Sequence, residues 1–261
     1  MSEPNQDEAP KEGEIVQTAL RKGVFSISRP GTKWLSTGAN GGYSTGPAAY
    51  NITVPSGWDR QDLDRYTRSR LQEAGFENRG PALLTGVSME HARIARAGPA
   101  AVVATAGVSN PAVFRSERTG ETETERTDHP PAGTVNIVVC VGRDLSPGAH
   151  ANLVAVTAEA KAAALLAETG FPGTTTDAVI VGCDPDATSV EFSGSATTVG
   201  VSVRSCVYHA VRASLRSRYS ETDLPESVEA AEYGVVTDRK PEITKPAPQK
   251  DQADRHKEET R

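Results

Sequence analysis

The stretch that decides the fold is residues 134–183, TVNIVVCVGRDLSPGAHANLVAVTAEAKAAALLAETGFPGTTTDAVIVGC. It begins with a short run of mostly apolar, β-branched residues, and residues 178–183 form a second such run. Both runs are typical of buried strands. The alanine-rich sequence between them predicts a helix, with Ser146 as N-cap, Pro147 in the first turn and Gly170 as the stop. Strand, helix and strand in this order favour a parallel or mixed sheet.

The flanking sequence continues this pattern. In chain order we expect a β-hairpin of residues 15–20 and 24–28, a short strand at 33–36, an extended segment at 51–54, a helix over 58–74, a strand at 81–85, a short helix over 89–97, a strand at 100–106, a short strand at 190–192 and a last helix over 199–218. The fold class is therefore α/β or α+β. We expect a mixed sheet with antiparallel N-terminal strands and helices packed on it.

The two ends of the chain and one internal stretch differ in composition from the rest. Residues 1–12 and 221–261 are polar, with almost no large apolar side chains. Such segments bury too little surface to offset the entropy of ordering them, so we expect disordered tails. The Thr- and Glu-rich stretch 115–132 ends in two prolines and indicates a mobile surface loop. Residues 13–220 are then expected to form a single domain.

Charge and hydropathy argue against several classes of protein. The net charge is −6, and the acidic excess lies in the tails, so the domain is close to neutral. A nucleic-acid-binding domain is normally basic, and we therefore expect no nucleic-acid partner. No apolar run reaches the ~18 residues of a membrane helix, and the acidic N-terminus is unlike a signal peptide. These features predict a cytoplasmic protein that does not bind membranes.

Cysteine, histidine and arginine usage adds three expectations. Cys140, Cys183 and Cys206 are odd in number and far apart, which argues against a disulfide framework, and each lies in an apolar run typical of the core. Neither these residues nor the histidines have the paired spacing of metal ligands, so we expect no metal. Arginine outnumbers lysine, which, with the acidic tails, is typical of proteins from salt-loving, GC-rich organisms.

The helix expected over 147–169 carries two charges in an otherwise small and mostly apolar sequence. Such a helix is expected to be buried on most sides, where charges are rare unless they are paired or functional. Glu159 and Lys161 project roughly 200° apart at about 100° per residue, so an ideal helix cannot aim both into one pocket. We favour Glu159 as a general base. The alternative is that Glu159 is half-exposed or ion-paired.

Polar residues beside the expected strands supply the other candidates. Asn136 lies inside an apolar strand and must find partners, so it either holds a loop in place or contacts substrate. The three hydroxyls and the carboxylate of residues 173–177, with Thr176 and Asp177 as the site candidates, suit a polar ligand or an activated water, or else form a turn in which Asp177 caps local N–H groups. Loops rich in glycine and asparagine could offer N–H groups and side chains to a substrate, at Asn40, Gly41, Gly42, Thr85 and Asn110. We expect these loops to line one pocket, since ligands of α/β sheets bind at strand ends.

Six sequence blocks occur in an order that is similar to one known family. They are LSTGANGG (35–42), TGV (85–87), TAGVSN (105–110), GTVNIVV (133–139), EAKAAAL (159–165) and TD (176–177). Over about residues 24–218 the chain resembles the adenosylcobinamide amidohydrolase family of cobalamin salvage. The resemblance implies hydrolysis of the amide between the corrin ring and aminopropanol. The corrinoid is then the substrate, and no cofactor is implied.

The chain departs from the family pattern at three places. The Gly-Thr-Gly-Thr-Asp-like block of the family is GTTTD (173–177) here, and the Thr before the Glu of the family is Ala158. After Gly194, where many members carry His, this chain has Ser195. The resemblance therefore gives no support to a mechanism that depends on that histidine.

Hydrolysis of an amide needs an activated nucleophile, stabilisation of the oxyanion and a proton for the leaving amine. In a first hypothesis Glu159 or Asp177 activates water, and Lys161 or the same acid protonates the amine. Backbone N–H groups of residues 107–111 or 173–176 then stabilise the oxyanion.

A second hypothesis uses the hydroxyl of Thr85 or Thr176 as the nucleophile. Two other classes of function stay open. One is a corrinoid- or nucleotide-binding module without catalysis. The other is an enzyme for a phosphate-bearing ligand, held by the glycine loops and by the arginines of residues 204–216, although that stripe is also typical of a solvated helix face. A homo-oligomer is compatible with the sequence, which does not fix the oligomeric state.

Overall fold

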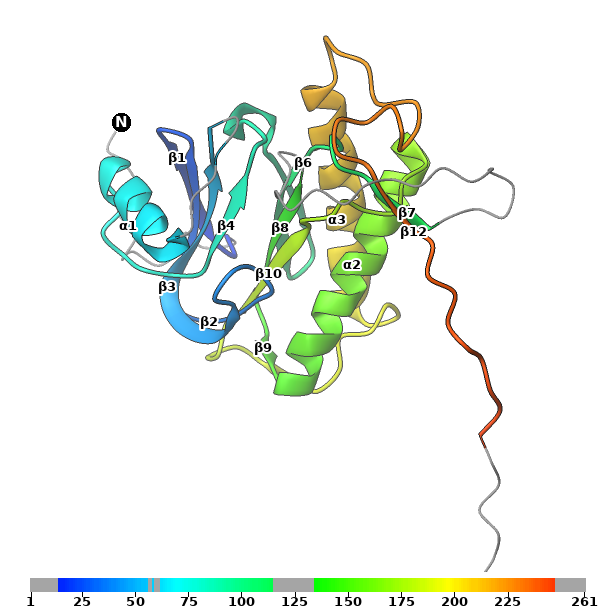
Figure 1. Ribbon diagram of the computed structural model, residues 1–261. Coiled ribbons are helices and arrows are strands. Elements are labelled where there is room, and N and C mark those ends of the chain that lie inside the picture. The colour runs from blue at the N-terminus through cyan, green and yellow to red at the C-terminus, as the bar shows by residue number, and fades with distance from the viewer. Residues whose placement is uncertain (1–13, 56–57, 59–61, 115–133, 247–261) are drawn as a thin grey trace, which may run out of the picture.

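The chain folds into a curled mixed sheet with two long helices on one face (Figure 1). The structure is a computed structural model, and it describes residues 14–55, 58, 62–114 and 134–246. The strands are β1 (Gln17–Arg21), β2 (Val24–Ser36), β3 (Gly42–Thr53), β4 (Ala82–Thr85), β5 (Arg93–Ala97), β6 (Ala100–Ala106), β7 (Ala112–Phe114), β8 (Val135–Val141), β9 (Asp144–Leu145), β10 (Ala178–Cys183), β11 (Ser189–Val190) and β12 (Val235–Thr237). The helices are α1 (Leu63–Glu73), α2 (Pro147–Thr169) and α3 (Thr198–Arg218), with a short 3-10 helix, η1 (Met89–His91).

The central βαβ unit is as the sequence predicts. β8 and β10 are parallel neighbours, and α2 connects them. Ser146 caps α2 by accepting a hydrogen bond from the Ala149 N–H, and Gly170 ends the helix in the left-handed conformation. The main sheet has the order β4-β3-β2-β10-β8-β6-β5, with β1 paired to β2. It combines parallel and antiparallel pairs, so the predicted α/β class with a mixed sheet is confirmed.

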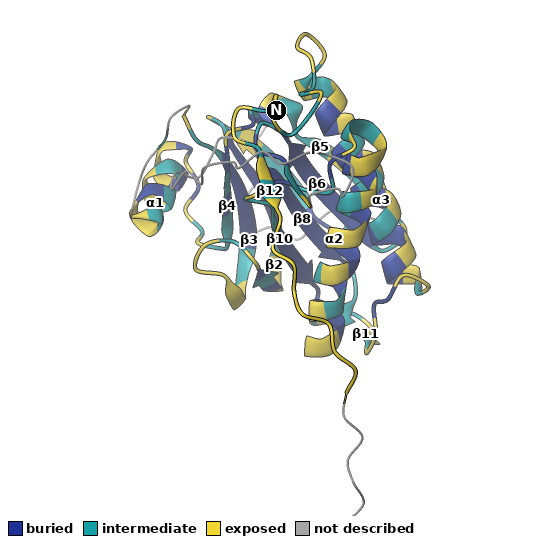
Figure 2. Ribbon diagram, turned by 45° about the vertical axis from the view of Figure 1, so that its right-hand side comes forward, coloured by how far each residue is buried: buried dark blue, intermediate teal, exposed yellow. Residues whose placement is uncertain are grey.

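Alternate residues of the strands build a core on each face of the sheet, and a third cluster joins β2 and β3 to α1. The odd-numbered residues of β8 (135–141) pack against α2 and α3, which lie over this face (Figure 2). Val138 and Cys140 point the other way and share a cluster with Trp34 of β2 and Leu83 of β4. Since β4 and β8 are distant in strand order but in contact, the sheet curls until its N-terminal strands close over its central ones.

The expectation that α2 is buried on most sides is wrong. One side of the helix packs on the sheet and on α3, while the other faces outward (Figure 2). The outward residues include Ala151, Ala155, Ala158 and Leu166. Small apolar side chains occupy both sides of α2, so its sequence pattern does not reveal which side is buried.

Several predicted elements differ from the structure. The strands expected at 24–28 and 33–36 are one strand, β2, with a register shift between Ser28 and Thr32 at the sequence Arg-Pro-Gly. The helix expected over 89–97 is wrong beyond His91, because residues 93–97 pair with β6 as β5. Gly98, with φ +48°, forms the turn of this hairpin and is not a helix stop. α1 begins only at Leu63, after the N-cap Asp62.

The segment after α3 also differs from the expected disordered tail. β12 pairs in parallel with β7, and the Tyr233 N–H donates to the Ser109 carbonyl (2.9 Å). Leu224 packs against the helix-side core. We call residues 224–237 the C-terminal brace. Because the brace is attached mainly through backbone groups, its polar composition gave no sign of this order.

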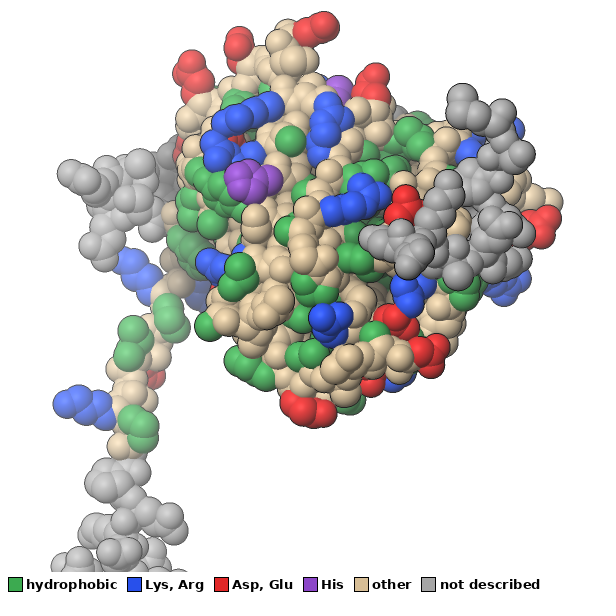
Figure 3. Space-filling model, turned by 180° about the vertical axis from the view of Figure 1, so that it is seen from behind, with side chains coloured by type: hydrophobic (Ala, Val, Ile, Leu, Met, Phe, Trp, Pro, Cys, Tyr) green, Lys and Arg blue, Asp and Glu red, His purple; other side chains and the backbone are tan. Residues whose placement is uncertain are grey.

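Several other expectations concern the whole chain. The tail 1–12, the loop 115–132 and residues 247–261 lie outside the described residues. The three cysteines are buried and unpaired, as expected for core positions. Among the described residues, none of the helices combines the length and apolar character needed to cross a membrane. On the face shown in Figure 3, lysines and arginines lie at separate points among uncharged and acidic groups.

Candidate functional site

Strand direction brings the glycine- and threonine-rich loops to one edge of the sheet. β2 and β6 run antiparallel to β10 and β8, so the loops after the first two strands meet the segments before the second two. Hydrogen bonds join them: the Val179 N–H donates to Thr37 Oγ1 (2.9 Å), and the Gly107 N–H donates to the Thr134 carbonyl (3.1 Å). We call this the polar edge and define it as residues 36–38, 106–111, 134–135 and 173–177.

Asp177 is at the centre of the polar edge. Its carboxylate accepts hydrogen bonds from the N–H groups of Val135 and Thr174 (both 3.0 Å), from the Thr174 hydroxyl and from the ammonium of Lys161. The side chains of Asp177 and Lys161 are both only 13% exposed. The alternative interpretation of Asp177 as a cap of local N–H groups is therefore confirmed. Four donors occupy the carboxylate oxygens and leave them little room for a further hydrogen bond.

Asn110 connects the loop after β6 to the three-threonine turn. Its side-chain Nδ2 donates to Thr175 Oγ1 (2.7 Å) and to Thr176 Oγ1 (3.2 Å), and its backbone carbonyl accepts from the Thr175 N–H (3.2 Å). The Thr176 hydroxyl donates to Thr134 Oγ1 (3.0 Å), and the Thr134 hydroxyl donates to the Thr176 carbonyl. Asn110 is fully buried, so in this structure it contacts the threonines and is closed to a substrate.

Asn136 belongs to a polar network inside the curl of the sheet. Its Nδ2 donates to Asn51 Oδ1 (2.9 Å) and to the Leu84 carbonyl (3.0 Å), and Asn51 Nδ2 donates to Thr105 Oγ1 (2.9 Å). All three polar side chains are buried. The network ties β3, β4, β6 and β8 together where the sheet closes on itself. This geometry matches the interpretation that Asn136 holds structure in place.

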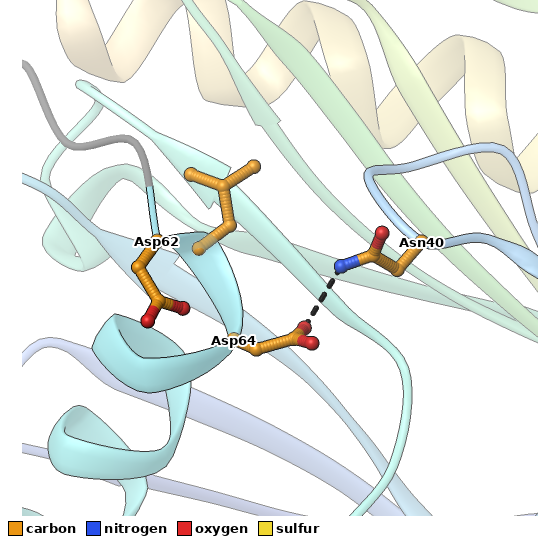
Figure 4. A pocket seen from close by; sticks show the side chains of 4 residues that line it. Asn40, Asp62 and Asp64 are labelled. Carbon is orange, nitrogen blue, oxygen red and sulfur yellow. Dashed lines mark hydrogen bonds between the residues drawn. The ribbon is translucent and has the colours of Figure 1, made fainter.

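The loop between β2 and β3 lies beside α1. A Cβ on Gly41 would lie 2.3 Å from the Ser36 carbonyl oxygen, and Gly42 has φ +103°, so both positions require glycine. Asn40 Nδ2 donates to Asp64 Oδ1 (2.8 Å) across an open hollow of about 450 Å³ (Figure 4). The hollow is lined by Asn40, Asp62, Leu63 and Asp64.

Thr85 is buried under the turn that follows β4. Its Oγ1 accepts a hydrogen bond from the Val87 N–H (3.0 Å), and the Val87 carbonyl accepts from the Thr53 hydroxyl (3.0 Å). The Val87 side chain packs so close to Gly107 that a Cβ there would lie 2.9 Å from it. Thr85 therefore lies below the polar edge and supports the loop after β6.

Glu159 lies on the other side of α2 from Lys161. Its carboxylate accepts a hydrogen bond from Arg204 of α3 (3.2 Å), and its side chain is 63% exposed. The angular separation expected from the sequence is thus observed. The structure places the exposed, ion-paired charge at Glu159 and the enclosed one at Lys161.

The expectation that all candidate residues line one pocket is wrong. The polar edge contains Asn110, Thr176 and Asp177, with Lys161 reaching it from α2. Asn136 and Thr85 are buried beneath it, Asn40 faces α1, and Glu159 faces α3. Because the sheet curls, alternate residues at the ends of its strands point into the interior and not toward the polar edge. Sequence reasoning missed Asn51 and Thr134 as members of these networks. Asn51 could have been found by the test applied to Asn136, since it too is an amide in an apolar strand.

In the part of the chain that the structure describes, no cluster of three or more His, Cys, Asp or Glu side chains is arranged to hold a metal ion. Burial lowers the pKa of His150, which lies near the start of α2 and contacts the Val181 carbonyl (3.3 Å). Burial also raises the pKa of Cys140 and Cys183, which keeps these thiols protonated and unreactive.

Comparison with known proteins then identifies the family. The family model described as adenosylcobinamide amidohydrolase matches residues 6–223. The chain belongs to this family. It is 51% identical to an adenosylcobinamide amidohydrolase of Halobacterium salinarum over 234 residues, which are 89% of this chain and 100% of the relative. It is 30% identical to an adenosylcobinamide amidohydrolase of Methanosarcina mazei over 213 residues, 77% of this chain and 96% of the relative.

The resemblance inferred from the six blocks is thus confirmed, and the halophilic relative fits the composition. The structure also locates one departure from the adenosylcobinamide amidohydrolase pattern. Ser195 lies beside Arg204, which donates to its Oγ (3.3 Å), on the same side of α3 as the Glu159 pair. The replaced histidine position therefore lies at the α2–α3 surface and not at the polar edge. The C-terminal brace begins after residue 223, where the family match ends.

Proposed function

We propose that this protein hydrolyses the amide that joins the corrin ring of adenosylcobinamide to aminopropanol, giving adenosylcobyric acid for cobalamin salvage. The observation that carries the proposal is the 51% identity to an adenosylcobinamide amidohydrolase along that relative's whole length. The polar edge supports it, because segments distant in the sequence supply hydroxyls, backbone N–H groups and a charged pair at one place. Amide hydrolysis uses these groups to activate a nucleophile, stabilise an oxyanion and protonate an amine.

Within this proposal the polar edge binds the scissile amide. Asp177 holds the 173–177 turn and orients Lys161, whose ammonium is the nearest proton source for the departing amine. Thr176, half-buried beside Thr134, is the candidate nucleophile of the second hypothesis. In the first hypothesis Asp177 accepts a proton from water only after substrate displaces one of its donors. Glu159 becomes the solvent-reaching charge of α2.

The two hypotheses differ in whether a covalent intermediate forms. A threonine nucleophile gives an acyl-enzyme, in which the corrin carboxyl is esterified to Thr176, whereas activated water gives the acid directly. Rapid quenching during turnover, followed by mass spectrometry of the intact protein, separates them. An adduct that is present in the wild type and absent in Thr176→Val supports the threonine form, and a protein mass without adduct at every time point supports water.

The direct test of the proposed function is product analysis. Purified protein is incubated with adenosylcobinamide, and the mixture is separated by chromatography. The proposal expects adenosylcobyric acid and aminopropanol in equal amounts. Bound but unconverted adenosylcobinamide would contradict it and would favour a corrinoid-binding module.

The phosphate-ligand alternative has less support. Its arginines on α3 are engaged by carboxylates of α2: Arg212 and Arg216 both contact Glu168, and Arg204 contacts Glu159. Hydrogen bonds from Arg216 and Arg212 lower the pKa of the Glu168 carboxyl, so a phosphate would have to displace a firmly ionised group.

We propose that the ligand is a corrinoid and that the protein has no nucleic-acid partner. The protein acts as a monomer or as a homo-oligomer. The three unpaired cysteines favour a reducing compartment such as the cytoplasm.

A further inference from the structure

The three-threonine turn contains one hydroxyl that is both exposed and held in place. Thr174 is buried and Thr176 is half-buried, while Thr175 lies at the exposed tip. An exposed threonine normally samples several rotamers. Here Asn110 forms two hydrogen bonds with Thr175. Its backbone carbonyl accepts from the Thr175 N–H (3.2 Å), and its side-chain Nδ2 donates to Thr175 Oγ1 (2.7 Å).

The direction of the hydrogen bonds around Asn110 follows from one backbone carbonyl. The Thr176 carbonyl can only accept, so the Thr134 hydroxyl donates to it. The Thr134 oxygen therefore accepts from the Thr176 hydroxyl, whose oxygen in turn accepts from Asn110 Nδ2. This sequence of donors fixes the amide of Asn110 with its nitrogen toward the threonines. Thr175 Oγ1 must then be an acceptor for Asn110, which leaves its own proton for a different partner.

None of the described residues accepts that Thr175 proton. A second feature indicates that the arrangement has a purpose beyond stability. Asn110 is fully buried, and its Oδ1 has no hydrogen-bond partner among the described atoms. A buried acceptor without a partner destabilises a fold, typically by about 1–3 kcal/mol. The orientation of the Asn110 amide therefore leaves its own Oδ1 without a hydrogen bond, but it positions the exposed hydroxyl of Thr175.

We propose that Thr175 contacts the substrate, donating a hydrogen bond to the scissile amide oxygen as that oxygen becomes an oxyanion, and that Asn110 is the positioning residue that aims the hydroxyl. This inference rests on the proposed function. It places the donor on the same turn as Thr176 and next to the Asp177–Lys161 pair, so the oxyanion donor, the candidate nucleophile and the proton source are adjacent in the chain or joined by hydrogen bonds. Asn110, expected from the sequence to bind substrate, acts through Thr175.

The test begins with Thr175→Val, which replaces the hydroxyl by a methyl group of similar size. Loss of one oxyanion donor lowers kcat by about 10²–10³-fold, and we expect this loss with KM changed less than about threefold. Thr175→Ser restores the hydroxyl and is expected to recover most of kcat. Thr188→Val, an exposed threonine in the loop at the opposite edge of the sheet, is the matched control and keeps wild-type kinetics.

Asn110→Asp tests the positioning role. An ionised aspartate only accepts hydrogen bonds, so the Thr175 hydroxyl would turn toward it and away from substrate. We expect kcat to fall as in Thr175→Val, and the double variant to be no slower than Thr175→Val alone. Asn110→Ser serves the same cycle if the buried charge prevents folding, which thermal unfolding of each variant reports.

The outcomes separate this inference from the proposed function. If the wild type does not release adenosylcobyric acid, the proposed function fails. If the wild type is active and Thr175→Val retains kcat within about twofold, the assignment of Thr175 is overturned. A loss confined to KM, or equal losses from Asn110→Asp with and without the Thr175 hydroxyl, would also overturn it.

Discussion

Two ion pairs of helix α2, only two residues apart in the sequence, differ in almost every physical respect. Lys161 pairs with Asp177 where both side chains are 13% exposed and the carboxylate has three further donors. Glu159 pairs with Arg204 where the side chains are 63% and 40% exposed. Water screens an enclosed ion pair little, and removing one partner of such a pair destabilises the fold strongly. An exposed ion pair contributes only ~0–1 kcal/mol to stability.

The difference shows how one helix can serve two purposes. The inner pair fixes the turn that carries Thr174, Thr175 and Thr176, and therefore the geometry of the polar edge. The outer pair joins α2 to α3 at the surface. If this comparison is right, substitutions at the two pairs should have unequal effects on both stability and activity, although the residues are close in the sequence.

The largest effect is expected for Lys161→Met, which keeps the length of the side chain and removes its charge. The Asp177 carboxylate is left enclosed without its cation, which typically destabilises a protein by about 3–5 kcal/mol. Displacement of the turn by even about 1 Å can lower kcat/KM about 100-fold. Urea unfolding and steady-state hydrolysis of adenosylcobinamide measure the two changes. Wild-type stability together with wild-type kcat/KM would refute the role of the inner pair.

A smaller loss is expected from removing the C-terminal brace by ending the chain at Ser220. The brace gives the loop after β6 two backbone hydrogen bonds, from Tyr233 to Ser109 and from Val235 to Pro111, besides the β7–β12 pairing. At about 0.5–1.5 kcal/mol per bond, the free energy of unfolding should fall by about 2 kcal/mol. We expect kcat to fall severalfold because the loop carries Asn110.

The matched control is a chain that ends at residue 246, which keeps the brace. It is expected to behave as the full-length protein in both assays. Equal loss in the two truncated proteins would show that the brace does not support the polar edge.

A third group on α2, His150, gives a pH-dependent test. Burial lowers its pKa, so below its ordinary value of 6.5 the unfolded chain binds a proton that the folded chain refuses. Stability due to this group is therefore present above about pH 6.5 and is lost as the pH falls below it. In His150→Gln the fall in the free energy of unfolding between pH 7 and pH 5 should be shallower. His91 has its pKa lowered in the same direction and is retained in both proteins, so the difference between them reports His150. An unchanged slope would contradict the assignment.

The smallest effect is expected at the outer pair. Glu159→Gln removes one partner of an exposed contact, so the free energy of unfolding should change by less than about 0.5 kcal/mol and kcat/KM by less than about twofold. The same two assays apply. A loss of kcat comparable to that of Lys161→Met would restore Glu159 as the general base and would break the comparison.

Much of the fold could be predicted because its strongest signals are local. Residues 134–183 carry two apolar strands, a capped helix and a glycine stop, and each is where the sequence places it. The errors arose where local signals were ambiguous. Gly98 can end a helix or turn a hairpin, and only the pairing of β5 with β6 decides between them. The brace is attached through backbone groups, which composition does not report.

The candidate site was harder to predict, because it depends on three-dimensional closure. The motif blocks identified the right family, since family membership is a property of the sequence. Sequence periodicity gave the opposite orientation of Glu159 and Lys161, but not which of them faces the polar edge. It also could not show that the curled sheet buries Asn136 with Asn51, or that Asn110 reaches Thr175.

Hydrogen–deuterium exchange with and without adenosylcobyric acid tests most directly where the reaction takes place. The account predicts that the product slows exchange in peptides covering residues 107–112 and 173–177, and leaves the α2–α3 surface around Glu159 and Arg204 unchanged. Slowed exchange at that surface, with none at the polar edge, would contradict the location of the site.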